Sequence, residues 1–273
     1  MMRSSLEVYE VATGRVRVIL QTNELIEAPN WDPKGGGFLV NGSGRLFLVP
    51  WERPRLVPID TGVLLRCNND HGFSPDGAQI AFSCHRENGA EIFVMPAAGG
   101  EAQVISPRAP SWFHGWSPDG RSIVYAAARG ERREVDICVL PLGGQERRLT
   151  WGEGHSDGPN FSADGGQVYY NSDRGGHAQI WVTGADGDGQ GQVFADDCVN
   201  WFPHPSPCGA HVLYLAYPPG TVGHPRDLAV ALCLMDPEGG DRRRVVQMNG
   251  GQGSINVASW APDGRAFAYM RYG

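Results

Sequence analysis

The sequence predicts an all-β fold, a six-bladed β-propeller built from four-stranded antiparallel blades. Three observations support this prediction: a high content of turn residues, a hydrophobic fraction large enough for a core, and a motif that recurs six times. The 273 residues include 38 Gly and 20 Pro, and 41% of them are hydrophobic. This balance is typical of many short strands joined by turns and not of a disordered chain.

The recurring motif is an aromatic residue followed by Ser-Pro-Asp-Gly or a close variant. It reads NWDPKG at 30–35, GFSPDG at 72–77, GWSPDG at 115–120, NFSADG at 160–165, HPSPCG at 204–209 and SWAPDG at 259–264. The turn glycines are 42, 43, 45, 44 and 55 residues apart, which gives a period near 43 with one insertion in the fifth unit. Four-stranded propeller blades have this period. Proline presets φ and glycine accepts a positive φ, so each Pro-Asp-Gly is predicted to be a structural turn.

Each unit is predicted to contain four strands within one domain that spans residues 1–273. The blades are expected to begin near residues 27, 69, 112, 156, 200 and 256. The fourth unit shows the pattern most clearly, with a strand around 160–161 and three more at 166–172, 178–184 and 191–195. Gly-rich and Asp-rich segments separate these apolar runs, as expected for turns.

The two chain ends are predicted to close the ring by sharing the last blade. The last segment, 256–273, contains the sixth turn and only one full strand, RAFAYMRY, whereas residues 4–20 hold two strands that belong to no other unit. Residues 4–20 are therefore expected to complete the last blade. An open array would leave this hydrophobic half-blade and its strand edges exposed.

Charge and apolar patterning limit the partners and the compartment. The net charge of −7 argues against a nucleic-acid partner, because phosphates require an excess of Lys and Arg. No apolar run is long enough to insert into a membrane, and the N-terminus lacks the apolar stretch of a signal peptide. We therefore expect a soluble cytoplasmic protein, or a periplasmic one if a leader has been removed. The six cysteines show no paired spacing and are expected to be reduced.

Two of the repeats carry a family resemblance. GFSPDGAQIAFSCHRENGAEIFV (72–94) and NFSADGGQVYYNSDRGGHAQIWV (160–182) resemble the WD40-like (PD40) repeat of TolB-type six-bladed propellers. The resemblance covers essentially the whole chain and implies the fold more than an activity, because similar blades occur in Tol-Pal components, in propeller domains of peptidases and, more distantly, in oligogalacturonate lyases. A peptidase is not expected, since no catalytic hydrolase domain is recognised beside the propeller repeats.

Polar residues gather in the segments that precede the six turns. In propellers of this family such segments open onto one mouth of the central channel, so we expect their side chains to converge there. The insertion YPPGTVGHPRD (217–227) is expected to overhang this mouth. The predicted ligand-binding residues are Glu27, Asn30, Asn69, Asp70, Asp157, Asn160, Asn200, Gln252, Asn256 and His224.

Four histidines from consecutive blades are candidate ligands of one divalent metal ion, together with Asp157 or Glu27. These histidines are His71, His114, His155 and His204. His71 and His114 share one register of the repeat, where the other blades carry Pro29, Pro159, Pro203 and Ala258, so the fold itself does not require histidine there. The alternative for each histidine is a structural hydrogen bond to a neighbouring strand.

Three function classes remain open from the sequence. The first is a non-catalytic propeller that binds a small sugar-like or peptide ligand, or a protein partner, at the channel mouth. The second is a metal-dependent carbohydrate-active lyase or hydrolase, in which a histidine acts as base and an arginine neutralises negative charge. Its candidate catalytic residues are His71, His114, Arg174 and Arg226. The resembling lyases hold a metal with histidines and a glutamine, a type of ligand that Gln252 could supply. The third class is a pure protein-interaction scaffold.

Overall fold

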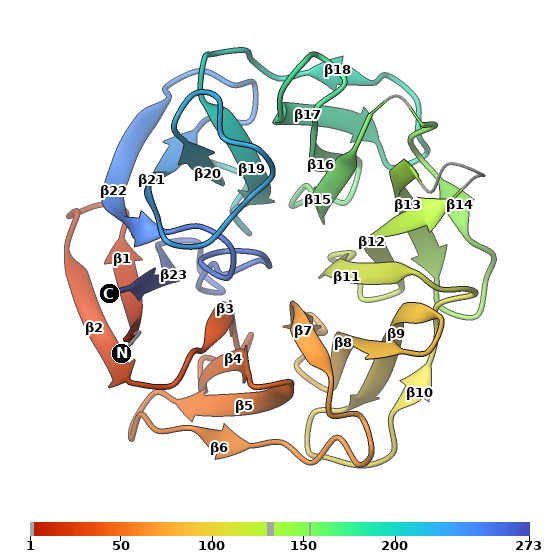
Figure 1. Ribbon diagram of the computed structural model, residues 1–273, viewed down its shortest axis with the longest axis vertical. Coiled ribbons are helices and arrows are strands. Elements are labelled where there is room, and N and C mark those ends of the chain that lie inside the picture. The colour runs from red at the N-terminus through yellow and green to blue at the C-terminus, as the bar shows by residue number, and fades with distance from the viewer. Residues whose placement is uncertain (1–2, 130–133, 153) are drawn as a thin grey trace.

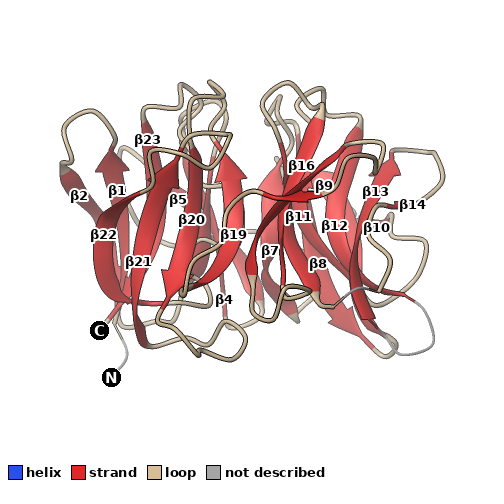
Figure 2. Cartoon of the chain, turned by 90° about the horizontal axis from the view of Figure 1, so that it is seen from above, coloured by secondary structure: helices blue, strands red, loops and turns tan. Residues whose placement is uncertain are grey.

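The computed structural model describes residues 3–129, 134–152 and 154–273. Every regular element in these parts of the chain is a β-strand, and the strands form six antiparallel sheets around a central channel (Figure 1). Seen from the side, the strands run between two layers of loops that cover the two ends of the ring (Figure 2). The predicted six-bladed β-propeller is therefore confirmed.

Five blades have four strands each, which follow one another from the channel outward. Blade 1 consists of β3 (Glu27–Trp31), β4 (Gly37–Gly42), β5 (Arg45–Pro50) and β6 (Val57–Pro58). Blade 2 consists of β7 (Cys67–Phe73), β8 (Gln79–Arg86), β9 (Gly89–Pro96) and β10 (Gln103–Val104). Blade 3 consists of β11 (Ser111–Trp116), β12 (Ser122–Arg129), β13 (Glu134–Pro141) and β14 (Arg147–Arg148). Blade 4 consists of β15 (Ser156–Phe161), β16 (Gln167–Ser172), β17 (Gln179–Gly184) and β18 (Gly191–Gln192). Blade 5 consists of β19 (Val199–Pro205), β20 (Val212–Tyr217), β21 (Leu228–Met235) and β22 (Arg243–Gly250).

Blade 6 joins the two ends of the chain. β1 (Ser4–Glu10) lies between β2 (Val16–Thr22) and β23 (Ala266–Tyr272) and is antiparallel to both. The two termini consequently lie close together at one edge of the ring (Figure 1). This pairing confirms the predicted closure. The innermost strand of the blade is reduced to a single bridge between Trp260 and Phe267.

An ion pair between a buried carboxylate and a partly exposed arginine holds this closure together. Glu7 on β1 is only 5% exposed, and its carboxylate accepts hydrogen bonds from the Tyr269 hydroxyl at 2.5 Å and from Nε of Arg271 at 3.0 Å. Burial raises the pKa of Glu7, but the hydrogen bonds from Arg271 and Tyr269 lower it by more, so the carboxyl is ionised at neutral pH. The pair connects the first and last strands of the protein.

The Pro-Asp-Gly segments are turns, and their side chains show why the motif recurs. In blade 2 the hydroxyl of Ser74 donates to Oδ1 of Asp76 at 2.6 Å, and the same oxygen accepts the backbone N–H of Ala78 at 2.9 Å. Gly77 has a φ of 65°, which glycine adopts without strain. In blade 5 Cys208 takes the place of the aspartate, with its Sγ atom 3.4 Å from the hydroxyl oxygen of Ser206.

The innermost strands of blades 1 to 5 each contain an irregularity in register. The shifts lie between Glu27 and Asn30, Cys67 and His71, Phe113 and Gly115, Asp157 and Asn160, and Trp201 and His204. A bulge of this kind bends the strand and redirects the side chains that follow it. Side chains before and after each bulge consequently point in different directions within the ring.

The six cysteines are free, in agreement with the predicted reduced state. Cys84, Cys138 and Cys233 are buried within strands, where they pack as small apolar side chains. Within the described residues, no helix is long and apolar enough to cross a bilayer.

Candidate functional site

A polar cavity of about 230 Å³ lies at the end of the channel where the innermost strands of blades 2 to 5 begin. We call this end the upper mouth. Its lining comes from several blades and from the 217–227 insertion, so the closed ring is needed to form it. The lining residues are Asn68, Asn69, Asp70, Trp112, His114, Val135, His155, Asp157, Phe202, His224, Gln252 and Asn256.

Asp157 is the central charged residue of the upper mouth. Its Oδ1 accepts a hydrogen bond from Nε2 of His114 at 3.0 Å, and its Oδ2 lies 3.6 Å from Nε2 of His155 and 3.9 Å from Nε2 of His224. Burial raises the pKa of Asp157, but the hydrogen bonds from His114 and His155 outweigh it and hold this pKa well below the usual range. Asp157 is therefore a carboxylate at neutral pH.

His114 connects Asp157 to the opposite side of the channel. Its Nε2 faces the carboxylate, and its Nδ1 lies 3.4 Å from the backbone oxygen of Asn256. Burial lowers the pKa of His114, but the interactions with Asp157 and Asp70 raise it above the ordinary value. Because both ring nitrogens face acceptors, the ring is held as an imidazolium.

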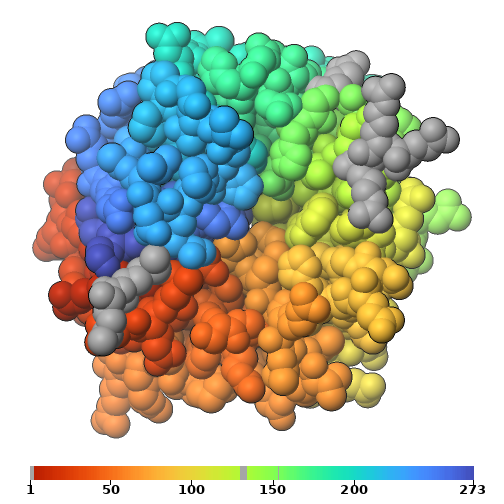
Figure 3. Space-filling model, viewed as in Figure 1, coloured from red at the N-terminus to blue at the C-terminus, as the bar shows by residue number. Residues whose placement is uncertain are grey.

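The 217–227 insertion joins β20 to β21 and covers one side of the upper mouth (Figure 3). A salt bridge from Nη2 of Arg226 to Oε1 of Glu27 attaches it to blade 1, and Nε of Arg226 donates to the backbone oxygen of Gln252 at 3.2 Å. His224 packs on the ring of Trp201, with 4.3 Å between the ring centroids, and its Nδ1 bonds to Oε1 of Gln252. These contacts fix the insertion over the cavity.

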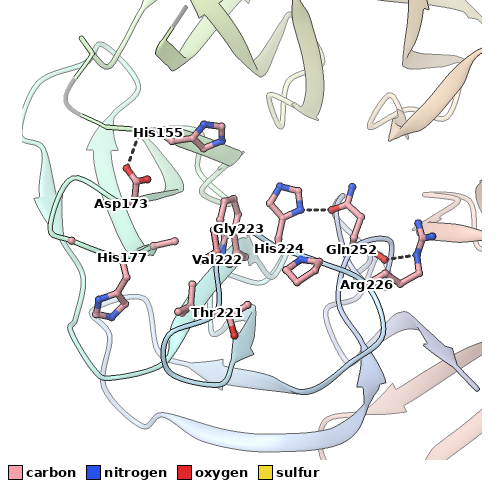
Figure 4. Close-up of a pocket in the computed structure, with 14 residues that line it drawn as sticks. His155, Asp173, His177, Thr221, Val222, Gly223, His224, Arg226 and Gln252 are labelled. Carbon is pink, nitrogen blue, oxygen red and sulfur yellow. Dashed lines mark hydrogen bonds between the residues drawn. The ribbon is translucent and has the colours of Figure 1, made fainter.

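A larger pocket of about 850 Å³ continues from the upper mouth beside the insertion. We call it the outer pocket, and Figure 4 shows the residues that line it. It shares His155, His224 and Gln252 with the upper mouth. Oδ1 of Asp173 accepts the backbone N–H of His155 at 2.7 Å, while the side chain of His155 is 43% exposed. Val222, at the insertion, lines the outer pocket and is 90% exposed. His155 therefore borders both cavities and is accessible from outside.

His71 and His204 correct the expectation that four histidines converge. Both are fully buried, and each donates from Nε2 to a backbone oxygen of the neighbouring blade, His71 to Ala28 at 2.9 Å and His204 to Ile255 at 2.6 Å. Burial lowers the pKa of each ring to about 4, so both are neutral. Each lies directly after a bulge, which turns its ring toward the neighbouring strand.

Asn30 and Asn160 also join blades and do not line the upper mouth. Asn30 donates to the backbone oxygen of Ala258 at 2.7 Å and accepts the backbone N–H of Phe73 at 2.9 Å. Nδ2 of Asn160 lies 3.1 Å from Nδ1 of His204. Because the Nε2 atom of His204 carries the proton, its Nδ1 is the acceptor in this contact.

Asn200 and Arg174 likewise lie outside the upper mouth. Asn200 is fully buried and donates to Oδ1 of Asp196 at 2.9 Å and to Oε1 of Gln179 at 3.2 Å. Arg174 donates to Oε1 of Gln190 at 2.9 Å, and its guanidinium lies 4.4 Å from the centroid of the Trp181 ring. The sequence could place these residues before or after a strand but could not show which way their side chains turn.

The structure gives no support to the predicted metal site. Within the parts of the chain that the structure describes, no group of three or more His, Cys, Asp or Glu side chains has an arrangement that could hold a metal ion. His114 has both ring nitrogens engaged with acceptors, and Nε2 of His71 and of His204 bonds to the backbone. Of the four candidate ligands, only His114 and His155 approach the same carboxylate.

A second pocket, of about 380 Å³, opens at the other end of the channel beside the Pro-Asp-Gly turns. We call it the lower mouth. His114 lines it as well as the upper mouth, so this ring lies between the two. Most other lining residues belong to the repeat itself, notably Trp31, Phe73, Trp116, Phe161 and Trp260. Sequence reasoning did not identify this pocket or the apolar upper-mouth residues Val135 and Phe202, because apolar side chains in a repeat look like core.

The fold and the channel define a closed six-bladed propeller with a polar, partly covered mouth. The family model of the TolB beta propeller domain (PD40) matches residues 108–226. The uncharacterized protein Atu1656 of Agrobacterium fabrum is 43% identical over 274 residues, which cover 99% of this chain and 93% of that protein. The chain belongs to the TolB-type β-propeller family.

Solved structures agree with this assignment. A TolB candidate from Agrobacterium tumefaciens is 43% identical and superposes with a TM-score of 0.97, covering 100% of this chain and 99% of that one. TolB from Acinetobacter baumannii, at 17% identity, has a TM-score of 0.71 over 92% of this chain and 64% of that one. An oligogalacturonate lyase in complex with manganese, at 14% identity, has a TM-score of 0.56 over 89% of this chain and 72% of that one. The last two likenesses show the fold alone.

Proposed function

We propose that this propeller is a binding protein that takes a small polar ligand into the upper mouth. The observation that supports this most is the position of Asp157, whose carboxylate meets His114, His155 and His224 in a cavity that opens into the outer pocket. Charged side chains are costly to remove from water unless they are paired and hydrogen-bonded. Concave sites with a few convergent polar groups are where proteins bind small ligands.

The residue types around Asp157 favour a ligand rich in hydroxyl or amide groups. The side-chain amides of Asn69 and Gln252 provide an acceptor and a donor, and Trp112 adds an aromatic surface on which a sugar ring could stack. A sugar-like molecule or a short peptide has this chemistry. A segment of a protein partner that reaches into the same cavity would use the same groups.

Catalysis is the second candidate function, and His155 is the observation that favours it. Burial lowers the pKa of His155, but Asp157 raises it above the ordinary value, and the side chain borders the outer pocket. A carboxylate that orients an exposed imidazole is an arrangement found in general acid–base catalysis. An oligosaccharide lyase or hydrolase would use His155 in this way. Arg226 is already paired with Glu27, which argues against its predicted role in neutralising substrate charge.

A ligand screen tests both candidates. Sugars and short peptides are screened for binding by ligand-observed NMR against the wild type, His155→Ala and His211→Ala. His211 lies beside a Pro-Asp-Gly-type turn in blade 5 and serves as the matched control. We expect ligands whose affinity falls at least tenfold in His155→Ala and is unchanged in His211→Ala. Chemical conversion of such a ligand would select the enzyme, whereas the absence of any His155-dependent ligand would overturn the proposal.

A further inference from the structure

Asp70 on β7 lines the upper mouth and differs from the two carboxylates that repel it, Glu27 and Asp157. Glu27 binds Arg226, and Asp157 binds His114, so each has a hydrogen-bonded cation. Asp70 is only 5% exposed, and its carboxylate bonds to the neutral side-chain amide of Asn68. Within the described residues no cationic group donates a hydrogen bond to it. A buried carboxylate without such a partner carries a large desolvation cost.

The charged groups around Asp70 do not supply the missing partner. His114 on β11 attracts the carboxylate, but its nitrogens are directed at Asp157 and at the backbone of Asn256. Asp157 on β15 and Glu27 on β3 repel it. Burial and these two carboxylates together raise the pKa of Asp70 to about 6, despite the attraction of His114. Near neutral pH the cavity therefore contains an anion that a positively charged group would stabilise.

We propose that Asp70 binds the protonated amine of the ligand, so that the ligand of the upper mouth is a small hydroxylated amine. This inference rests on the proposed function and names the chemical class of its ligand. An ammonium donates charge-assisted hydrogen bonds to a carboxylate, and the rings of Trp112 and Phe202 provide faces that attract cations.

The remaining polar groups of the cavity suit the hydroxyls of such a ligand. Oε1 of Gln252 is occupied by His224 and Asn256, whereas its amide nitrogen has no hydrogen-bond partner among the described residues. Nδ2 of Asn69 lies 3.4 Å from Oε1 of Glu27, and its Oδ1 is left as an acceptor. One free donor and one free acceptor therefore accompany the carboxylate in the same cavity.

A matched pair of probes tests the inference. D-glucosamine and D-glucose differ by an ammonium in place of one hydroxyl, and both are titrated at pH 7.5, where Asp70 is ionised. Ligand-observed NMR gives the affinities for the wild type, Asp70→Asn and Asp241→Asn. Asp241 is the control because it is an exposed carboxylate that lines neither mouth and pairs with Arg243 on the surface of blade 5. We expect glucosamine to bind the wild type at least tenfold more tightly than glucose, with the difference lost in Asp70→Asn and kept in Asp241→Asn.

The other outcomes are informative in different ways. Equal affinities for the two sugars, or glucosamine binding that Asp70→Asn leaves unchanged, would overturn the amine inference while the proposed function stands. Failure of both sugars to bind, alongside a His155-dependent ligand that carries no amine, would do the same. If no ligand of any class depends on His155, both the proposed function and the amine inference are overturned. The comparison of the two sugars on the wild type needs no variant and holds even if Asp70→Asn does not fold.

Discussion

Nε2 of His114 and Oδ1 of Asp157 lie 3.0 Å apart, and this ion pair joins blade 3 to blade 4 inside the channel. The two side chains are 3% and 15% exposed, so the pair is shielded from water and from salt. The same carboxylate faces His155 at the entrance to the outer pocket. Asp157 thus contacts both His114, which joins the two blades, and His155, which is the more exposed of the two histidines.

Asp157→Asn tests this pair. The amide keeps the shape of the side chain but removes the charge, so the imidazolium of His114 loses its main stabilisation. We expect the free energy of unfolding to fall by about 3 kcal/mol in urea denaturation, as for other broken buried pairs. The pKa of His114, followed by NMR, should fall because the hydrogen bond and the charge of Asp157 are lost while the burial of the ring remains. Asp241→Asn, in an exposed pair with Arg243, is the control and should cost less than about 1 kcal/mol. An unchanged His114 pKa would contradict the assignment.

The neutral, buried His71 and His204 predict a loss of stability in mild acid. Burial lowers their pKa values from 6.5 to about 4. Between these two pH values each ring therefore binds a proton in the unfolded chain but not in the native state. The contribution of each ring to stability therefore falls by about 2 kcal/mol between pH 7 and pH 5, while the raised pKa values of Asp70, His114 and His155 act in the opposite direction. Urea denaturation at both pH values measures the change. His204→Gln keeps a donor for Ile255 but cannot titrate, and we expect its slope to be smaller; an equal slope would refute this account.

Arg226→Gln tests whether the insertion is held over the upper mouth by its salt bridge to Glu27. The pair is 25% and 12% exposed, so its loss should lower global stability by only about 1 kcal/mol. Hydrogen exchange of residues 217–227 should become several-fold faster, because the anchor to blade 1 is gone. Arg265→Gln, from an exposed pair, should leave exchange there unchanged. Unchanged exchange in Arg226→Gln would show that other contacts hold the insertion.

Glu7→Gln tests the closure of the ring. The substitution leaves Arg271 and Tyr269 without their carboxylate in the blade that joins the chain ends. We expect about 1–2 kcal/mol of destabilisation in urea, because Glu7 is buried but Arg271 is 35% exposed. Glu10→Gln removes an exposed partner of Arg15 from the same strand and should have little effect. Equal effects of the two substitutions would mean that the pair of Glu7 and Arg271 does not secure the closure.

The fold could be predicted because its signals are local. The hydrogen bonds of Ser74 and Asp76 and the positive φ of Gly77 fall within one turn, so the motif specifies the turn wherever it recurs. The spacing of the turns then gives the number of blades, and the orphan strands at the chain ends give the closure. The compartment of the protein stays a prediction.

The site could be predicted only in part, because side-chain direction depends on features that the sequence does not display. Asp157, His155 and Gln252 were placed at the mouth by their position before a turn. His71 occupies an equivalent position, but the bulge before it turns the ring toward Ala28. Side chains alternate along a strand, so one extra residue reverses which way the next one points. Phe202 lines the cavity without any polar signal that could reveal it.

Crystallography with soaked fragments tests the central claim most directly. Crystals of the protein are soaked with a fragment set that contains sugars, hydroxylated amines and apolar rings, and the bound positions are mapped. The account predicts that polar fragments bind in the upper mouth, within hydrogen-bond distance of Asp157, His155 or Asp70. Polar fragments that bind only at the lower mouth or on the outer surface of the blades would contradict it.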